Sequence, residues 1–183
     1  MDTTIDTLPV RQVPVPAAVR AATTLTRIDY ADTFLADVGP TGTRTAEAWA
    51  RAVLEDAPLP RRSALLAGWT ALGLRLDLRG PDAVLGWPVR QSTPDAVLLG
   101  TGSLLGMRAE LLFTREPDAL RFATLVQLDT RAARAAWTGV ERVHVPTVLA
   151  LFGGASERLC RAAVTHRAPS HGAPAQGPRS APA

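Results

Sequence analysis

The sequence predicts an α+β protein, because runs of strands and runs of helices follow one another along the chain instead of alternating. Between Pro81 and Thr130, four apolar segments are separated by turn residues, which indicates an antiparallel meander. After Asp129 the chain becomes rich in alanine and reads as a long helix. A long terminal helix is well suited to cover an antiparallel sheet.

One strand and two helices are predicted ahead of the meander. The segment 23–34 is rich in threonine and β-branched residues, which favour strands. Thr45 is a suitable N-cap for a helix that runs to Asp56. The apolar face of this helix consists of Ala46, Trp49, Ala50, Val53 and Leu54. Two prolines end the helix, and the second of them, Pro60, can open another helix that runs to about Leu74. The expected buried side of the second helix consists of Leu65, Leu66, Trp69 and Leu72.

The meander is predicted to contain strands at 84–91, 96–102, 107–115 and 120–129. Turn residues divide them, at Thr93-Pro94-Asp95 and at Glu116-Pro117-Asp118. The final helix should begin near Ala132. Pro146 should kink or break it, because proline removes a backbone donor, and Gly153-Gly154 should weaken it again.

A single domain is predicted for residues 21–166, with an extended or disordered arm over 1–20 and a disordered tail, rich in proline and alanine, over 167–183. The N-terminus lacks the pattern of a secretory signal, and no apolar stretch is long enough to cross a bilayer, so a cytoplasmic protein without a transmembrane segment is expected. The single cysteine, Cys160, excludes an internal disulfide and a cysteine-rich zinc site. No cofactor and no metal site are predicted, and the oligomeric state is left open.

The charge of the chain is carried unevenly. All 20 basic residues are arginine, and the formal net charge is +3. Residues 1–130 contain 13 Arg and 15 Asp or Glu, whereas residues 131–183 contain 7 Arg and 2 Asp or Glu. The basic C-terminal part could contact anionic lipid or nucleic acid, but solvated arginines are the usual explanation of such a pattern. No nucleic-acid partner is predicted.

Four short stretches carry a resemblance to a known family. They are Asp29-Tyr30-Ala31-Asp32-Thr33-Phe34, Ala48-Trp49-Ala50-Arg51, Val84-Leu85-Gly86-Trp87, and Trp137 followed by His144-Val145-Pro146-Thr147-Val148-Leu149. In these stretches the chain resembles small bacterial members of the START/Bet v1-like (SRPBCC, polyketide cyclase-like) superfamily. The resemblance implies a helix-grip fold, in which a curved antiparallel sheet packs around a long C-terminal helix and encloses an apolar cavity. Because only about 50 residues lie between the predicted helices and the terminal helix, the cavity should be smaller or partly open.

Strand alternation predicts which side chains would line that cavity. The predicted lining is almost wholly apolar: Leu85, Trp87, Val89, Met107, Leu111, Phe113, Phe122, Thr124 and Val126. The opposite face would carry Arg108, Glu110, Arg121 and Gln127 as exposed groups that pair across strands. On the final helix, Trp137 and His144 would share one stripe, which faces the sheet.

Two roles stay open for His144. A single histidine on an apolar stripe is often a structural group. Inside a cavity it can also orient a carbonyl or hydroxyl group, or exchange a proton near neutral pH, and Tyr30 is a second catalytic candidate. We therefore expect a protein that binds an apolar small molecule or lipid-like metabolite. The alternatives are an enzyme of the cyclase or aromatase type, and a structural domain with a filled core, because members of the superfamily differ in activity.

Overall fold

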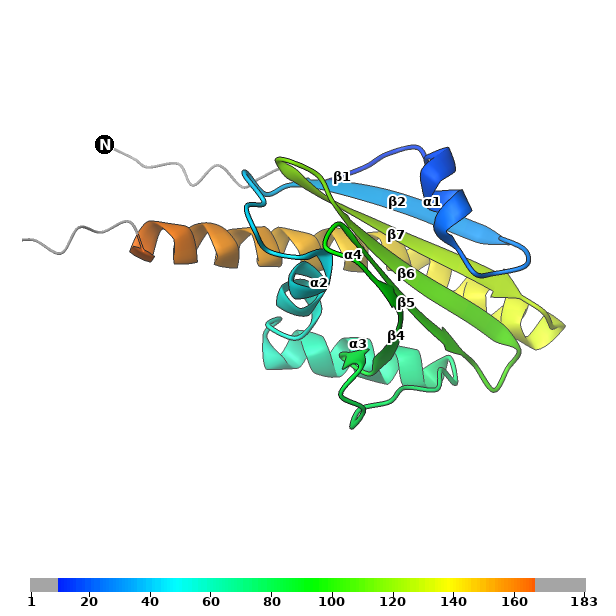
Figure 1. The fold of residues 1–183 in the computed structure, drawn as a ribbon. Helices are drawn as coiled ribbons and strands as arrows, with labels where there is room; N and C mark the ends of the chain where they lie inside the picture. Colours follow the sequence, from blue (N-terminus) through cyan, green and yellow to red (C-terminus); the bar gives the residue numbers. More distant parts are fainter. Residues whose placement is uncertain (1–9, 167–183) are drawn as a thin grey trace, which may run out of the picture.

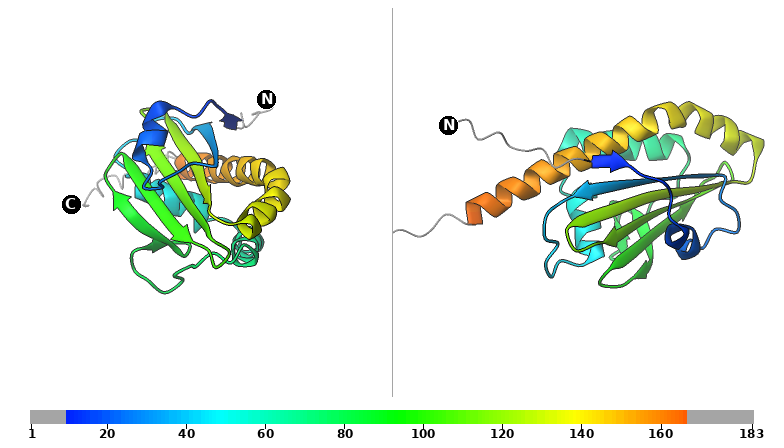
Figure 2. Two further views of the ribbon diagram at one scale, coloured as in Figure 1. Left: turned by 90° about the vertical axis from the view of Figure 1, so that its right-hand side faces the viewer. Right: turned by 90° about the horizontal axis from the view of Figure 1, so that it is seen from above.

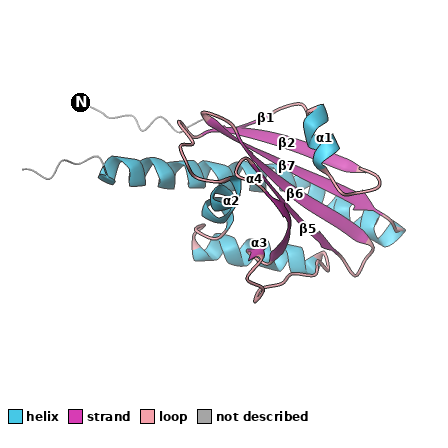
Figure 3. Ribbon diagram, in the orientation of Figure 1, coloured by secondary structure: helices cyan, strands magenta, loops and turns pink. Residues whose placement is uncertain are grey.

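The computed structural model describes residues 10–166, so the predicted tail and the first nine residues of the predicted arm lie outside the described residues. A seven-stranded antiparallel sheet has the order β1 (Val10–Gln12), β2 (Tyr30–Asp37), β7 (Ala119–Leu128), β6 (Met107–Arg115), β5 (Ala96–Gly102), β4 (Trp87–Ser92) and β3 (Ala83–Val84). The helices are α1 (Ala17–Ala22), α2 (Ala46–Leu54), α3 (Leu59–Ala71) and α4 (Arg131–His166). The prediction of an α+β fold with a long C-terminal helix packed against an antiparallel sheet is confirmed (Figures 1 and 3).

The main core lies between the sheet and α4. Phe113 and Phe122 project from neighbouring strands with their ring centroids 4.9 Å apart, and Phe152 of α4 lies 5.1 Å from Phe122. All three rings are buried. Helix α2 contributes Trp49 and Val53 to the same core. It begins where the sequence predicts, because the Thr45 hydroxyl accepts a hydrogen bond from the Ala48 N–H.

Helix α4 is continuous through Pro146 and Gly153-Gly154, so the break, one of the two outcomes expected at Pro146, does not occur. It bends within its first half (Figure 2), which is what a missing backbone donor permits. Pro146 lies on the exposed side of the helix, whereas Val148 and Leu151 are buried, so packing against the sheet outweighs the local cost of the proline.

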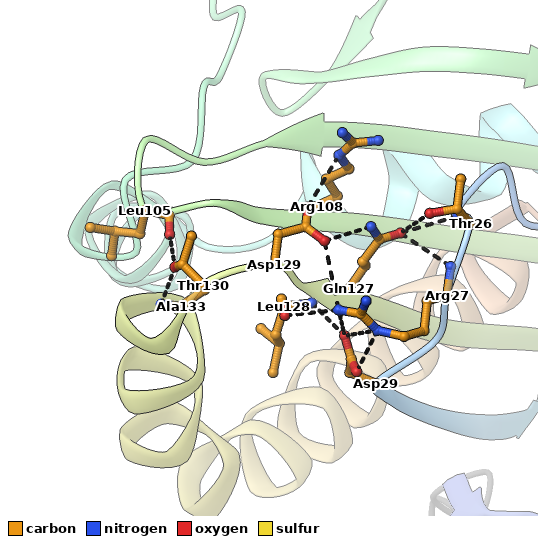
Figure 4. A network of polar contacts seen from close by, with 10 residues as sticks. All are labelled: Thr26, Arg27, Asp29, Leu105, Arg108, Gln127, Leu128, Asp129, Thr130 and Ala133. Atoms are coloured by element: carbon orange, nitrogen blue, oxygen red, sulfur yellow. Dashed lines mark hydrogen bonds and ion pairs between the residues drawn. The ribbon is translucent and has the colours of Figure 1, made fainter.

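A network of polar contacts fixes the start of α4 beside the ends of β2 and β7 (Figure 4). The Thr130 hydroxyl accepts a hydrogen bond from the Ala133 N–H, which caps the helix. Asp29, just before β2, accepts hydrogen bonds from the Arg27 side chain and from the Leu128 N–H at the end of β7. These contacts set where α4 leaves the sheet and hence which of its faces meets the core.

The opposite face of the sheet is covered by the segment 13–28, which includes α1 (Figure 2). Glu110 and Gln127, predicted to be exposed, are buried there, so that expectation is wrong for these two residues. The Glu110 carboxylate accepts hydrogen bonds from Thr23 and Thr24, and Gln127 accepts from the Thr26 N–H. Arg108 is exposed and Arg121 is half-buried.

Two strands have bounds in the structure that differ from the predicted ones. Residues 23–29 form the polar part of the cover, and the strand predicted at 23–34 is observed at 30–37 as β2. The strand predicted at 84–91 is divided by a turn at Leu85-Gly86, where both residues have positive φ.

Within the predicted arm, residues 10–12 form β1 on the sheet edge and α1 begins at Ala17, because Val19 fills an apolar patch of the sheet. No described helix is both long and apolar enough to span a membrane.

Candidate functional site

An apolar groove lies between α3 and α4. Its volume is about 460 Å³, which falls within the range of small-molecule pockets. Leu65, Gly68 and Trp69 form the α3 wall, and Leu111 and Phe122 of the sheet also line it. The α4 wall consists of Val140, Val143, His144, Thr147, Val148, Ala150 and Leu151. We call this site the groove.

The α3 wall is apolar and packs against the core only in part. No residue of α3 is buried, and Leu65 and Trp69 are only half-buried. Leu65 and Trp69 of the predicted buried side are half-buried and pack against the core, and Leu66 is half-buried, so this side of the helix is less deeply buried than predicted. Trp69 lies edge-to-face on the buried Trp87, with ring centroids 5.4 Å apart, and this contact holds the helix against the sheet.

Four polar side chains meet where α4 crosses β2 and β7: Tyr30, Asp32, Thr124 and His144. We call them the polar cluster. Nε2 of His144 lies 3.0 Å from Oδ2 of Asp32 and 3.2 Å from Oγ1 of Thr124. The Tyr30 hydroxyl donates to the same Asp32 oxygen over 2.7 Å. The cluster forms because Asp32 is opposite Thr124 in the register of β2 and β7, and Tyr30 lies two residues earlier on the same face.

The Asp32 carboxylate organises the polar cluster. Asp32 is 2% exposed, and its Oδ1 also accepts a hydrogen bond from the Thr124 N–H over 3.3 Å. Since an ionised carboxylate only accepts hydrogen bonds, its contact with His144 requires the hydrogen of the imidazole to be on Nε2. Nδ1 of the neutral ring is then the nitrogen that can accept a hydrogen bond. Asp32 thus selects one tautomer of a histidine that lines the groove.

Tyr30 acts as a hydrogen-bond donor in this cluster. Burial raises the pKa of its phenol, and the hydrogen bond to Asp32 raises it further. The hydroxyl therefore stays protonated at neutral pH. Trp137 packs on both rings, with centroids 4.8 Å from Tyr30 and 5.5 Å from His144. Its indole Nε1 is buried and has no hydrogen-bond partner.

The structure brings some of the predicted site residues together and separates others. Tyr30, Thr124, Trp137 and His144 come together at the polar cluster and its aromatic neighbour. Leu111, Phe122 and His144 line the groove. Trp87, Met107, Phe113 and Val126 are buried in the core and do not line the groove. Leu85 lies in the turn between β3 and β4. Helix α4 packs on β1, β2 and β7, toward one edge of the sheet, and the open space lies at the side of α4, against α3.

Sequence reasoning missed the α3 wall of the groove and two charged residues, Asp32 and Arg61. Asp32 carried a usable signal, since it follows Tyr30 by two residues and so shares its face of a strand. Arg61 lines the groove from α3 and donates a hydrogen bond to the Ala150 carbonyl of α4. No sequence signal identified it, because its role depends on how α3 sits against α4.

A second, smaller pocket of about 270 Å³ lies beside Thr41 and Gly42. Its arginine, Arg115, already bonds to Asp95 and to the Gly42 carbonyl. Within the part of the chain that the structure describes, no three His, Cys, Asp or Glu side chains are grouped to hold a metal ion. The groove with its polar cluster is therefore the site on which a function can be argued.

Comparisons with known proteins add little to this geometry. No family model matches the chain, and no curated protein matches it. One solved structure, of protein Ms6760 from Mycobacterium smegmatis, is similar at 15% sequence identity over 77% of this chain and 98% of that chain, with a TM-score of 0.27. A TM-score this low carries no argument about fold or function.

Proposed function

We propose that the protein binds an apolar small molecule, such as a lipid-like metabolite, in the groove. The observation that carries this proposal is an open apolar groove with a half-buried, oriented histidine on one wall. Such sites combine an apolar lining with a small number of placed polar groups. Membership of the START/Bet v1-like superfamily is part of the same proposal.

The surface of the groove also favours a bound molecule. Val143 lines it and is 59% exposed, so a large apolar side chain faces solvent at its mouth. A ligand between α3 and α4 would cover this side chain and the half-buried apolar side of α3 together. Binding would therefore stabilise the helix that contributes least to the core.

A second candidate function is an enzyme of the cyclase or aromatase type. The observation that favours it is the contact of 3.0 Å between His144 and Asp32, with the protonated Tyr30 hydroxyl on the same carboxylate. A carboxylate that orients a histidine prepares it to take up a proton through its other nitrogen. In this role His144 would act as general base on a substrate in the groove, and Tyr30 would act through Asp32.

Fluorescence of N-phenylnaphthylamine, a neutral apolar dye, tests binding in the groove. A Cβ atom on Gly68 would meet nothing within 4 Å, so Gly68→Phe adds a side chain to the groove without displacing the core. Gly139→Phe is the matched control, because Gly139 also has open space but lies on α4 outside the groove. Both changes remove a helical glycine, which favours the helix.

We expect the dye to bind the wild type and the Gly139→Phe variant with similar affinity. The Gly68→Phe variant should bind at least about tenfold more weakly, which corresponds to about 1.4 kcal/mol. Equal binding by all three proteins would place the dye elsewhere. A folded wild type that does not bind the dye would favour the third possibility, a structural domain.

A further inference from the structure

Arg61 introduces a positive charge at one end of an otherwise apolar groove. Its guanidinium crosses from α3 to α4 and donates a hydrogen bond to the Ala150 carbonyl. Among the described residues that line the groove, none is an aspartate or glutamate. The groove therefore contains a cation whose observed partner is a neutral carbonyl oxygen.

This partner differs from those of several arginines that stabilise the fold by pairing with carboxylates. Arg51 forms ion pairs with Glu47 and Glu55 on its own helix. Arg121 likewise pairs with Glu116. A guanidinium has five N–H donors, so Arg61 can keep its bond to Ala150 and still bind a carboxylate. Hydrogen bonds between a guanidinium and a carboxylate are about twice as strong as neutral ones.

A second guanidinium, that of Arg158, lies near this end of the groove and donates a hydrogen bond to the Ala52 carbonyl. A Cβ atom built on Gly154 of α4 would lie 3.5 Å from Nη1 of Arg158 and 3.9 Å from Nη1 of Arg61. Two arginines from different helices thus flank one glycine, one turn beyond Ala150.

The distance between the polar groups of the groove sets the shape of its ligand. His144 and Ala150 are six residues apart on α4, which corresponds to about 9 Å along the helix axis. Between them the groove is lined by apolar side chains, among them Leu65, Val148 and Leu151. An apolar body of that length connects an anion at Arg61 to a hydrogen-bonding group at His144.

We propose that the ligand of the groove is an amphipathic carboxylic acid whose carboxylate binds Arg61 and whose apolar body runs between α3 and α4 toward His144. A hydroxyl or carbonyl group about 9 Å from the carboxylate can then bond to His144. This proposal rests on the proposed function, since it names the chemical class of the molecule in the same groove.

Displacement of N-phenylnaphthylamine by decanoate and by decanol tests the proposal. The two competitors have the same chain length and differ in the charge of the head group. The variants are Arg61→Gln, Arg61→Lys and, as the control, Arg142→Gln, because Arg142 is an exposed arginine of α4 that does not line the groove. Thermal melts establish that each variant is folded.

We expect Arg61→Gln to weaken decanoate about tenfold or more and to leave decanol within about twofold of the wild type. Arg61→Lys should retain part of the preference for decanoate, since it keeps the charge, and Arg142→Gln should behave as the wild type. In the wild type, added salt should weaken decanoate but not decanol. This last measurement needs no variant, so a folding defect in an Arg61 variant leaves the test intact.

The outcomes separate the two proposals. If the dye binds but Arg61→Gln affects decanoate and decanol equally, or salt weakens neither, the carboxylate proposal is wrong and the proposed function stands. If the dye does not bind the folded wild type, both fail. If Arg142→Gln weakens decanoate as much as Arg61→Gln does, the effect is one of overall charge, and the assignment to Arg61 is overturned.

Discussion

Replacement of Asp32 by alanine should destabilise the protein, because it removes the group that holds the polar cluster together. The carboxylate accepts hydrogen bonds from the Tyr30 hydroxyl over 2.7 Å and from the Thr124 N–H over 3.3 Å, and it lies 3.0 Å from His144. At 2% exposure, Asp32 is beyond the reach of water that could replace it as an acceptor. The variant leaves these donors without their acceptor.

The expected loss follows from the number and kind of these bonds. A hydrogen bond to a charged group contributes about 1.5–3 kcal/mol, and two side chains donate to this carboxylate. The variant also avoids the desolvation cost of burying a carboxylate, and this gain offsets part of the stability that the lost hydrogen bonds contributed. The net loss in the free energy of unfolding should be about 2–4 kcal/mol, equivalent to about 5–15 °C in Tm for a protein of this length.

Urea unfolding followed by circular dichroism measures this loss. Asp118→Ala is the control, because Asp118 is exposed, and it should change the stability by less than about 0.5 kcal/mol. Asp32→Asn keeps an oxygen acceptor and should lose about half as much as Asp32→Ala. If Asp32→Ala is as stable as the wild type or more stable, this reasoning is refuted. The carboxylate would then lower the stability of the folded protein, as charged groups of catalytic sites do.

Three further predictions concern pH and the turn beside α4. The pKa of Tyr30 is raised first by burial and then by its hydrogen bond to Asp32, so the contribution of Tyr30 to stability should be constant up to pH about 10 and should fall above it. Because Tyr30 is the single tyrosine, tyrosinate absorbance should rise only as the circular dichroism signal is lost. The hydrogen bond from Arg27 lowers the pKa of Asp29 to about 2. The contribution of Asp29 to stability should therefore be present above pH about 4 and should disappear as the pH falls toward 2. In an acid titration, the stability of Asp29→Asn should depend less on pH in that range than the stability of the wild type does. Gly106 has φ of +81°, and a Cβ atom there would lie 2.5 Å from Cγ2 of Thr130. Gly106→Ala should therefore be less stable than the wild type by about 1–2 kcal/mol, which thermal unfolding measures.

The strands of the meander were predictable because their ends carry local signals. The turns at 93–95 and 116–118 contain proline and aspartate, and β5, β6 and β7 begin and end within one or two residues of the predicted positions. The long helix was predictable for the same kind of reason. Its continuity through Pro146 was not, because burial of Val148 and Leu151 depends on a sheet that the local sequence does not describe.

The site was less accessible to sequence reasoning than the fold. Helical spacing placed His144 on the stripe that meets the sheet, but its partner Asp32 is 112 positions away and lies beside it only because α4 packs against β2. Alternation identified the outer face of the sheet correctly and still missed that Glu110 and Gln127 are covered. The cover comes from residues 13–28, and alternation within a strand contains no information about a segment that packs on it.

The position of a bound apolar molecule tests the central claim most directly. Amide chemical-shift changes on addition of N-phenylnaphthylamine should be largest at residues 64–72 and 140–151, which line the groove, and small on the opposite face around α1. The Gly68→Phe variant should show these changes weakly or not at all. Changes concentrated on the opposite face, or equal changes in the variant, would contradict the assignment of the groove as the binding site.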